Sequence, residues 1–122
     1  MPTVEIKSID ENRVKRAVDE YAAELFFEHP EVLQVVVFGS FVTRTFAPGS
    51  DVDIFILLSG SDKSVRDRVP DLLPHDFPIG VDIFPYTQSE AAAMEDSPVL
   101  RAVKLSPWRY QRPGPGGRER DR

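Results

Sequence analysis

Two apolar runs decide the fold of this chain: VVVFGS at residues 35–40 and SDVDIFILL at residues 50–58. Continuous apolar runs of this length, bounded by glycine, serine and acidic residues, are typical of buried strands. We therefore predict strands over residues 33–38 and 51–58. The Pro48-Gly49 turn between them is too short for a parallel crossover that contains a full helix, so we expect an antiparallel pair.

Helical and strand patterns alternate in the rest of the chain. Apolar residues recur at helical spacing from Val14 to Leu25, behind a predicted capping box at residues 8–11, until Pro30 ends the helix. The other predicted elements are, in order, a helical segment over residues 41–45, a helix over 65–73, a strand over 79–84 closed by Pro85, a helix over 90–95 capped by Ser89, a helix over 98–105 and an edge strand over 108–110. This order predicts a single α/β (α+β) domain whose mixed sheet is backed by helices.

Composition and charge narrow the classes of function. The 122 residues allow one domain, which we place at residues 1–110, and the apolar content of 41% is ordinary for a globular protein. Residues 111–122 contain Arg, Pro and Gly with almost nothing apolar, and we expect them to form a disordered tail. The net charge is −5, to which residues 109–122 contribute +3 and residues 1–108 contribute −8, so nucleic acid is a poor partner for the body of the chain.

The sequence also limits location and metal chemistry. The N-terminus has no apolar signal core, and no stretch reaches the roughly 18 apolar residues that a membrane helix needs, so we expect a cytoplasmic protein without membrane contact. There is no cysteine, which excludes disulfides and thiolate metal sites. Any bound metal must use oxygen ligands or the two histidines.

Three aspartates interrupt the predicted strands. Asp51 and Asp53 project from the same face of one strand, because successive side chains of a strand alternate. Asp82 lies in a run Val-Asp-Ile of another predicted strand. Neighbouring carboxylates repel each other, and a divalent cation such as Mg²⁺ or Mn²⁺ relieves the repulsion. Gly39 permits close backbone approach and Ser40 offers a hydroxyl and an amide to phosphate, which together indicate a metal-nucleotide site. Taken singly, each of these acids is as consistent with a turn residue or a surface charge as it is with a metal ligand.

The spacing of these residues resembles the signature of the minimal nucleotidyltransferases of the DNA polymerase β superfamily. The resemblance is carried by Gly39-Ser40, by Ser50-Asp51-Val52-Asp53 and by Asp82 within Val-Asp-Ile-Phe. It covers about residues 10–110, nearly the whole domain. It implies a single nucleotidyltransferase domain, a mixed sheet backed by helices, with Mg²⁺ as cofactor, two ions being expected and Mn²⁺ an alternative.

The resemblance also implies a role for each residue of the site. The catalytic and metal-binding carboxylates become Asp51, Asp53 and Asp82, and the nucleotide-binding residues become Gly39, Ser40 and Ser50. Among these, Asp82 is the candidate base. Gly39 and Ser40 are the expected contacts of the triphosphate, and Ser50 supports the loop before Asp51.

One position departs from the pattern. A second glycine commonly follows the first by five residues in this family, and here Arg44 stands at that position. If the backbone has a positive φ there, arginine costs about 1 kcal/mol or more. Two further interpretations of Arg44 stay open, a contact to phosphate and a solvated arginine on a loop.

The implied activity is transfer of a nucleoside monophosphate, AMP from ATP in our expectation, to a hydroxyl acceptor. Minimal members of the family often resemble antitoxins of toxin–antitoxin systems, paired with a helical HEPN-type protein. We therefore expect ATP or another NTP as substrate and such a partner as acceptor, or pairing with a second copy of the chain. Two alternatives are a catalytically weak or inactive subunit that neutralises a helical partner by binding, and an aminoglycoside-type enzyme that modifies a small molecule.

The end of the domain carries an aromatic and basic cluster. Trp108 and Tyr110 stand beside Arg109 and Arg112. Such a cluster stacks on nucleic acid in some proteins, and in others it anchors the end of a sheet. The anchor is the interpretation we favour.

Overall fold

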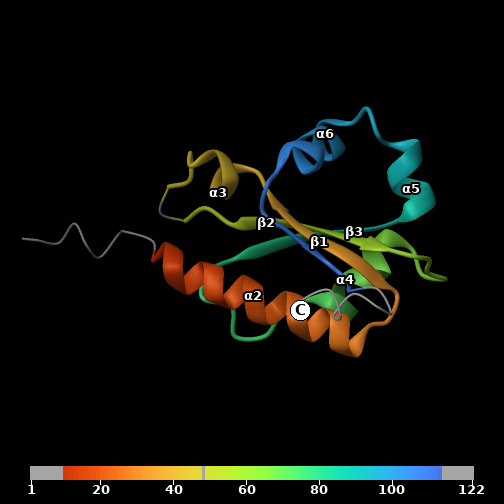
Figure 1. The fold of residues 1–122 in the computed structure, drawn as a ribbon, viewed down its shortest axis with the longest axis horizontal. Helices are drawn as coiled ribbons and strands as arrows, with labels where there is room; N and C mark the ends of the chain where they lie inside the picture. Colours follow the sequence, from red (N-terminus) through yellow and green to blue (C-terminus); the bar gives the residue numbers. More distant parts are fainter. Residues whose placement is uncertain (1–9, 48, 114–122) are drawn as a thin grey trace, which may run out of the picture.

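The computed structural model describes residues 10–47 and 49–113, which form a four-stranded sheet with helices on both faces (Figure 1). In chain order the elements are α2 (Glu11–Glu28), β1 (Val32–Phe38), α3 (Ser40–Thr43), β2 (Val52–Leu58), α4 (Val65–Leu72), β3 (Val81–Thr87), α5 (Gln88–Ala93), α6 (Pro98–Leu105) and β4 (Arg109–Gln111). Among the described helices, none combines the length and apolar character of a membrane-crossing segment.

The strand order of the sheet is β3-β2-β1-β4. β1 pairs antiparallel with both β2 and β4, while β2 and β3 run parallel with α4 in the connection between them. The predicted mixed sheet and its antiparallel pair are confirmed. Because of these directions, the C-terminal end of β1 and the N-terminal ends of β2 and β3 lie at one end of the sheet.

The helices form two layers, with α2 and α4 against one face of the sheet and α5 and α6 against the other (Figure 1). The side chains of β2 alternate between these layers: Ile54 and Ile56 join the core under α2, and Phe55 joins the core under α6. All three are at most 2% exposed. A strand buried on both faces needs a continuous apolar run, which is what the sequence shows at this place.

α2 is long because its buried residues follow a helical period. Its buried stripe is Val14, Val18, Tyr21, Ala22 and Leu25. The helix begins at an N-cap, Asp10, whose side chain accepts a hydrogen bond from the N–H of Arg13 at 3.1 Å. This cap replaces the predicted capping box, whose first residue, Ser8, lies outside the described residues.

Two predictions about the end of β3 were wrong. Pro85 does not close the strand, which continues to Thr87. β3 is an edge strand, and an edge tolerates a residue without an N–H because one side of the strand faces no partner in the sheet. The cap of α5 is Thr87 and not Ser89: the Thr87 hydroxyl accepts from the N–H of Glu90 at 3.2 Å, and the Glu90 carboxylate accepts from the N–H of Thr87 at 2.9 Å.

β4 closes the other side of the sheet and is held by side chains. The indole N–H of Trp108 donates to the hydroxyl of Tyr110 at 2.9 Å, and that hydroxyl donates to Asp19 of α2. Both aromatic residues are half-buried against the core, which agrees with an anchor. Arg112 donates to three main-chain carbonyls near the end of α2, so the predicted boundary after residue 110 falls inside an ordered segment. Residues 114–122 of the predicted tail lie outside the described residues.

Candidate functional site

The predicted acidic residues gather where β1 ends and where β2 and β3 begin. In the sheet, Asp53 of β2 is the register partner of Phe38 of β1 on one side and of Asp82 of β3 on the other. Asp51 comes immediately before β2 and two residues before Asp53, so it projects toward the same face. Asp53 is half-buried, while Asp51 and Asp82 are exposed. The topology thus brings three carboxylates from two strands to one end of the sheet.

These carboxylates lie close enough to affect one another. The pKa of Asp53 is raised above its ordinary value of 3.8, first because burial disfavours its charged form, and then because Asp82 and Asp51 repel its negative charge. A carboxylate in such surroundings is stabilised by any cation that approaches it. The arrangement therefore favours binding of positive charge at Asp53.

Gly39 makes room for the carboxylate of Asp53. A Cβ atom on Gly39 would lie 2.4 Å from Oδ2 of Asp53, and the backbone of Gly39 has φ +85° and ψ −149°, a conformation that L side chains rarely adopt. Its carbonyl accepts the first hydrogen bonds of α3, from Val42 at 2.9 Å and from Thr43 at 3.1 Å. Glycine is therefore required here twice, for the turn and for the space, and Ser40 follows it as the first residue of α3.

A second glycine, Gly80, makes room for the carboxylate of Asp51. This role of Gly80 was not predicted from the sequence. A Cβ atom on Gly80 would lie 2.1 Å from Oδ1 of Asp51. The carbonyl of Gly80 also accepts a hydrogen bond from the N–H of Val52 at 2.9 Å. The signal available in the sequence was a glycine directly before Val81-Asp82-Ile83, in a segment with strand character.

The loop before Asp51 is fastened by Ser50. The N–H of Ser50 donates to the carbonyl of Ala47 at 2.9 Å, and the hydroxyl of Ser50 accepts from the N–H of Ala47 at 2.8 Å. These two bonds close the turn that contains Gly49, whose φ is +91°. Ser50 thereby fixes the point at which the chain enters β2.

The ligand chemistry of the site suits a hard divalent cation. All three side chains offer carboxylate oxygens, the ligands that Mg²⁺ and Mn²⁺ prefer. Within residues 10–47 and 49–113, no group of three or more His, Cys, Asp or Glu side chains is gathered closely enough to hold an ion as it stands. The three carboxylates suit such an ion in chemistry and charge, but the described side chains as they stand do not form a ready site for it.

Arg44 shows the backbone conformation expected of the missing glycine. It ends α3 with φ +65° and ψ +33°, in the left-handed region. Its guanidinium forms two hydrogen bonds with the carboxylate of Glu11, at 2.7 and 3.1 Å, and lies 5.9 Å from the centre of the Phe46 ring. The side chain is 67% exposed. The sequence raised a positive φ at this position only as a condition, which the structure meets, and the ion pair with Glu11 was not among the interpretations of Arg44.

The aromatic residues beside α3 line a hollow that lies outside the acidic cluster. Phe41 and Phe46 stack with ring centres 4.5 Å apart and an angle of 9° between the rings. With Val14, Val42 and Trp108 they contribute to a pocket of about 270 Å³, and none of the three aspartates lines it. Phe41 is buried in the core, as expected for a packing residue. The three carboxylates meet at the acidic end of the sheet and not in this pocket.

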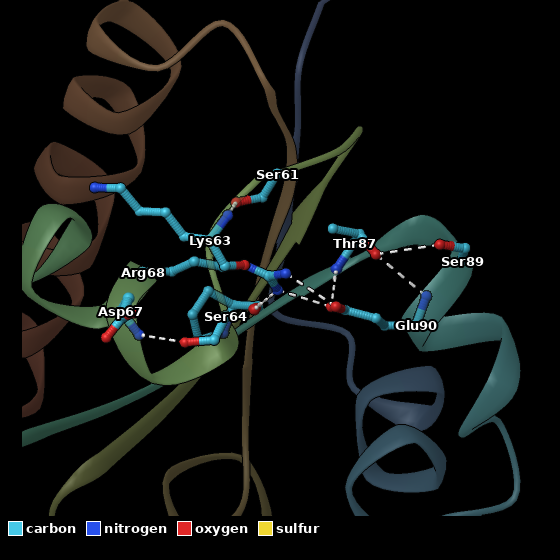
Figure 2. Close-up of polar contacts among 9 residues, drawn as sticks. Ser61, Lys63, Ser64, Asp67, Arg68, Thr87, Ser89 and Glu90 are labelled. Atoms are coloured by element: carbon cyan, nitrogen blue, oxygen red, sulfur yellow. Dashed lines mark hydrogen bonds and ion pairs between the residues drawn. The ribbon is translucent and has the colours of Figure 1, made fainter.

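A partly buried ion pair at the other end of β3 was not predicted from the sequence. Arg68 of α4 is only 5% exposed and donates to the carboxylate of Glu90 at 2.7 and 2.9 Å, to the carbonyl of Pro85 at 2.9 Å and to the carbonyl of Lys63 at 3.0 Å (Figure 2). These bonds from Arg68, followed by the bond from the N–H of Thr87, lower the pKa of Glu90 to about 2. The pair joins α4, β3 and α5, and it lies away from Asp82, which is near the start of β3. The pair stabilises the fold and is not part of the acidic cluster. Its only indication in the local sequence was the Thr87-x-x-Glu90 capping box, which contains Glu90.

Similarity to known proteins covers the part of the chain that contains the acidic cluster. A family model described as "Nucleotidyltransferase domain" matches residues 18–103, which include all three aspartates and both glycines described above. A solved structure from Sulfolobus solfataricus, whose description as a nucleotidyltransferase is itself a proposal, is similar with 25% sequence identity and a TM-score of 0.56. The similarity covers 70% of this chain and 78% of that one. No curated protein matches the sequence significantly.

Proposed function

The chain belongs to the nucleotidyltransferase domain family, whose members transfer a nucleotidyl group from an NTP, and we propose that it transfers AMP from ATP to a hydroxyl group of a partner protein. One observation carries the proposal. Asp53 and Asp82 are register partners on parallel strands, at the end of the sheet where Gly39 leaves room for the Asp53 carboxylate. This is the place to which the triphosphate and its counter-ions would come.

The proposal assigns a role to each predicted residue. Nucleotidyltransferase domains usually use divalent metal ions, and here the ligands would be Asp51, Asp53 and Asp82, with Mg²⁺ as the ion and two ions in the complete site. When bound, the ions supply positive charge that offsets the charge of the triphosphate. Gly39 and Ser40 contact the triphosphate, while Ser50 holds the loop through its two hydrogen bonds to Ala47.

The transfer exchanges one bond at phosphorus for another. The hydroxyl oxygen of the acceptor forms a bond to the α-phosphorus of ATP, the bond from that phosphorus to the bridging oxygen breaks, and pyrophosphate leaves. Asp82 accepts the proton of the hydroxyl group. We assign this role to Asp82 because it is exposed on an edge strand, where an acceptor can reach it, whereas Asp53 is half-buried inside the sheet.

A protein acceptor would meet two large apolar side chains that remain outside the core. Phe27 of α2 is 88% exposed and Leu105 of α6 is 84% exposed. They lie on opposite faces of the sheet, so they would offer a partner two separate contacts and not one apolar patch. In this proposal the partner is a helical protein of HEPN type, and the chain acts as the antitoxin-type member of the pair.

A second candidate is a binding subunit with weak or no catalysis. Two observations favour it: the acids of the described residues do not form a ready-made ion site, and Arg44 occupies a left-handed position in the turn after Gly39. In this case the acidic end of the sheet contributes charge to the interface with the partner and transfers nothing.

The deciding experiment combines binding with mass spectrometry. Calorimetry with ATP and Mg²⁺, and again with ATP and a chelator, tests whether nucleotide binding requires the ion. The protein is then co-purified with its partner from its host and incubated with ATP and Mg²⁺, with Asp53→Asn as the matched control. A mass gain of one AMP on the partner, absent with Asp53→Asn, supports the enzyme; a stable complex with no mass gain supports the binding subunit. Equal affinity for ATP with and without the ion would defeat the metal-dependent enzyme.

A further inference from the structure

The residues just before β2 and β3, Asp51 and Gly80, lie against each other. The N–H of Val52, the first residue of β2, donates to the carbonyl of Gly80, the residue just before β3, at 2.9 Å. A methyl group on Gly80 would lie 2.1 Å from Oδ1 of Asp51 and 2.9 Å from its Cγ. The carboxylate of Asp51 therefore fills the space that any larger residue at position 80 would occupy.

We propose that Gly80 is a positioning residue of the active site, whose missing side chain lets the Asp51 carboxylate stand beside the other two aspartates. The inference rests on the proposed function, since the position of Asp51 matters only if the carboxylates act together on a cation. Gly80 itself touches neither ion nor nucleotide in this proposal. It acts by leaving space.

The need for glycine at this position is steric and not conformational. Gly39 has a positive φ of +85°, as does Gly49 at +91°, but Gly80 is not among the described residues with positive φ. Alanine at position 80 therefore causes no backbone strain. Among the described residues, the three atoms nearest to the added Cβ atom all belong to the side chain of Asp51.

The side chain of Asp51 can rotate away from a larger residue at position 80. Such a substitution can therefore affect the site without affecting the stability of the fold. Asp51 is exposed and precedes the first residue of β2, so rotation of its carboxylate disturbs no core contact. The same rotation takes an oxygen ligand away from the metal position. A substitution at Gly80 should therefore leave the fold intact and weaken the site.

The test compares Gly80→Ala with a matched control, Gly60→Ala. A Cβ atom on Gly60 meets no atom within 4 Å, so the same chemical change there enters open space. ATP binding is measured by calorimetry over a range of Mg²⁺ concentrations, and thermal unfolding is measured without ligand. For Gly80→Ala we expect the half-saturating Mg²⁺ concentration to rise roughly tenfold or more, the scale found when residues that orient metal ligands are changed. Gly60→Ala should match the wild type, and the melting temperature of both variants should stay within a few degrees of the wild type.

A double-mutant cycle shows whether Gly80 acts through Asp51. In the background of Asp51→Ala the carboxylate is gone, so Gly80→Ala should cause no further loss of Mg²⁺-dependent binding. Additive losses, or wild-type Mg²⁺ dependence in Gly80→Ala, would overturn the inference and leave the proposed function standing. If the wild type binds ATP without regard to Mg²⁺, the proposed function fails, and the inference fails with it.

The cycle also covers a variant that does not fold. If Gly80→Ala unfolds alone but folds together with Asp51→Ala, the clash with the carboxylate is demonstrated and the inference is supported. If it unfolds in both backgrounds, Gly80 serves the fold and the inference is overturned.

Discussion

Asp53 of β2 and Asp82 of β3 stand directly opposite each other in the parallel pair of strands, each carrying a carboxylate. Nothing in the packing of a sheet favours two acids in register, because like charges on neighbouring strands destabilise it. Burial, and then the charges of Asp82 and Asp51, raise the pKa of Asp53. A bound divalent cation would offset this repulsion.

The first prediction follows from this repulsion. Asp53→Asn should raise the melting temperature of the metal-free protein slightly, because it removes a charge that burial and two neighbours disfavour. It should also abolish the stabilisation that Mg²⁺ and ATP give to the wild type. Thermal unfolding with and without Mg²⁺ and ATP measures both effects. A variant that melts well below the wild type without ligand would show that Asp53 is needed for the fold.

The acidic cluster was predictable because its residues stand in short sequence patterns that also predict the strands. Asp51 and Asp53 alternate with apolar residues, Asp82 has apolar neighbours, and Gly39-Ser40 follows a buried strand, so strand pairing alone brings them together. The main helices and strands were predictable for the same reason, since each has a clear period or a continuous apolar run.

The parts that were missed depend on contacts between distant residues. The local sequence predicts an exposed arginine on a short helix at Arg68. Only the fold brings its guanidinium to Glu90 and to the carbonyl of Pro85. Pro85 reads as the end of a strand unless it is known that β3 lies at the edge of the sheet. The need for glycine at position 80 arises from the side chain of Asp51, 29 positions earlier in the sequence.

The second prediction concerns the partly buried ion pair of Arg68 and Glu90. Glu90→Ala should destabilise the fold by on the order of 2 kcal/mol; loss of one partner of a fully buried pair costs about 3–5 kcal/mol, and the side chain of Glu90 is 37% exposed. Glu90→Gln should lose less, because an amide oxygen still accepts hydrogen bonds from Arg68 and from the N–H of Thr87. Denaturant unfolding at neutral pH compares the two variants. Equal stability of Glu90→Ala and wild type would show that water replaces the carboxylate at no cost.

The same ion pair gives the fold a pH dependence, which is the third prediction. Hydrogen bonds from Arg68 lower the pKa of Glu90 from 4.5 to about 2, so the folded state binds its proton less readily than the unfolded state. The contribution of Glu90 to stability is therefore complete above pH 4.5 and is lost as the pH falls from there toward 2. The difference in unfolding free energy between wild type and Glu90→Gln should shrink over this window. A difference that stays constant across it would contradict the role of the charge.

The fourth prediction separates the backbone of Arg44 from its side chain. Arg44→Gly relieves a left-handed conformation, while Arg44→Ala keeps that conformation, and both remove the exposed ion pair with Glu11. Arg44→Gly should therefore be more stable than Arg44→Ala by about 1 kcal/mol, the cost of a left-handed residue with a side chain. Glu11→Gln, which removes the ion pair alone, should cost only a few tenths of a kcal/mol because the pair is exposed. Thermal or denaturant unfolding of the three variants tests this, and the reverse order of the two Arg44 variants would contradict it.

The last prediction concerns the end of the domain, where Arg112 holds the C-terminal end of α2. Its guanidinium donates to the carbonyls of Phe26 at 2.9 Å, His29 at 2.8 Å and Val32 at 2.7 Å, and it lies 5.2 Å from the centre of the Phe26 ring. The first two carbonyls belong to the last turn of α2 and its cap, groups that have no partner inside the helix.

Arg112→Ala should therefore destabilise the fold by on the order of 2 kcal/mol, the range of hydrogen bonds to a charged group. A chain ending after Pro113 keeps Arg112 and should melt within about a degree of the full chain, because residues 114–122 contain no apolar side chain that could join a core. Thermal unfolding of the two proteins beside the wild type measures the contrast. A chain ending after Pro113 that melts as low as Arg112→Ala would show that the stabilising contacts come from the residues beyond it.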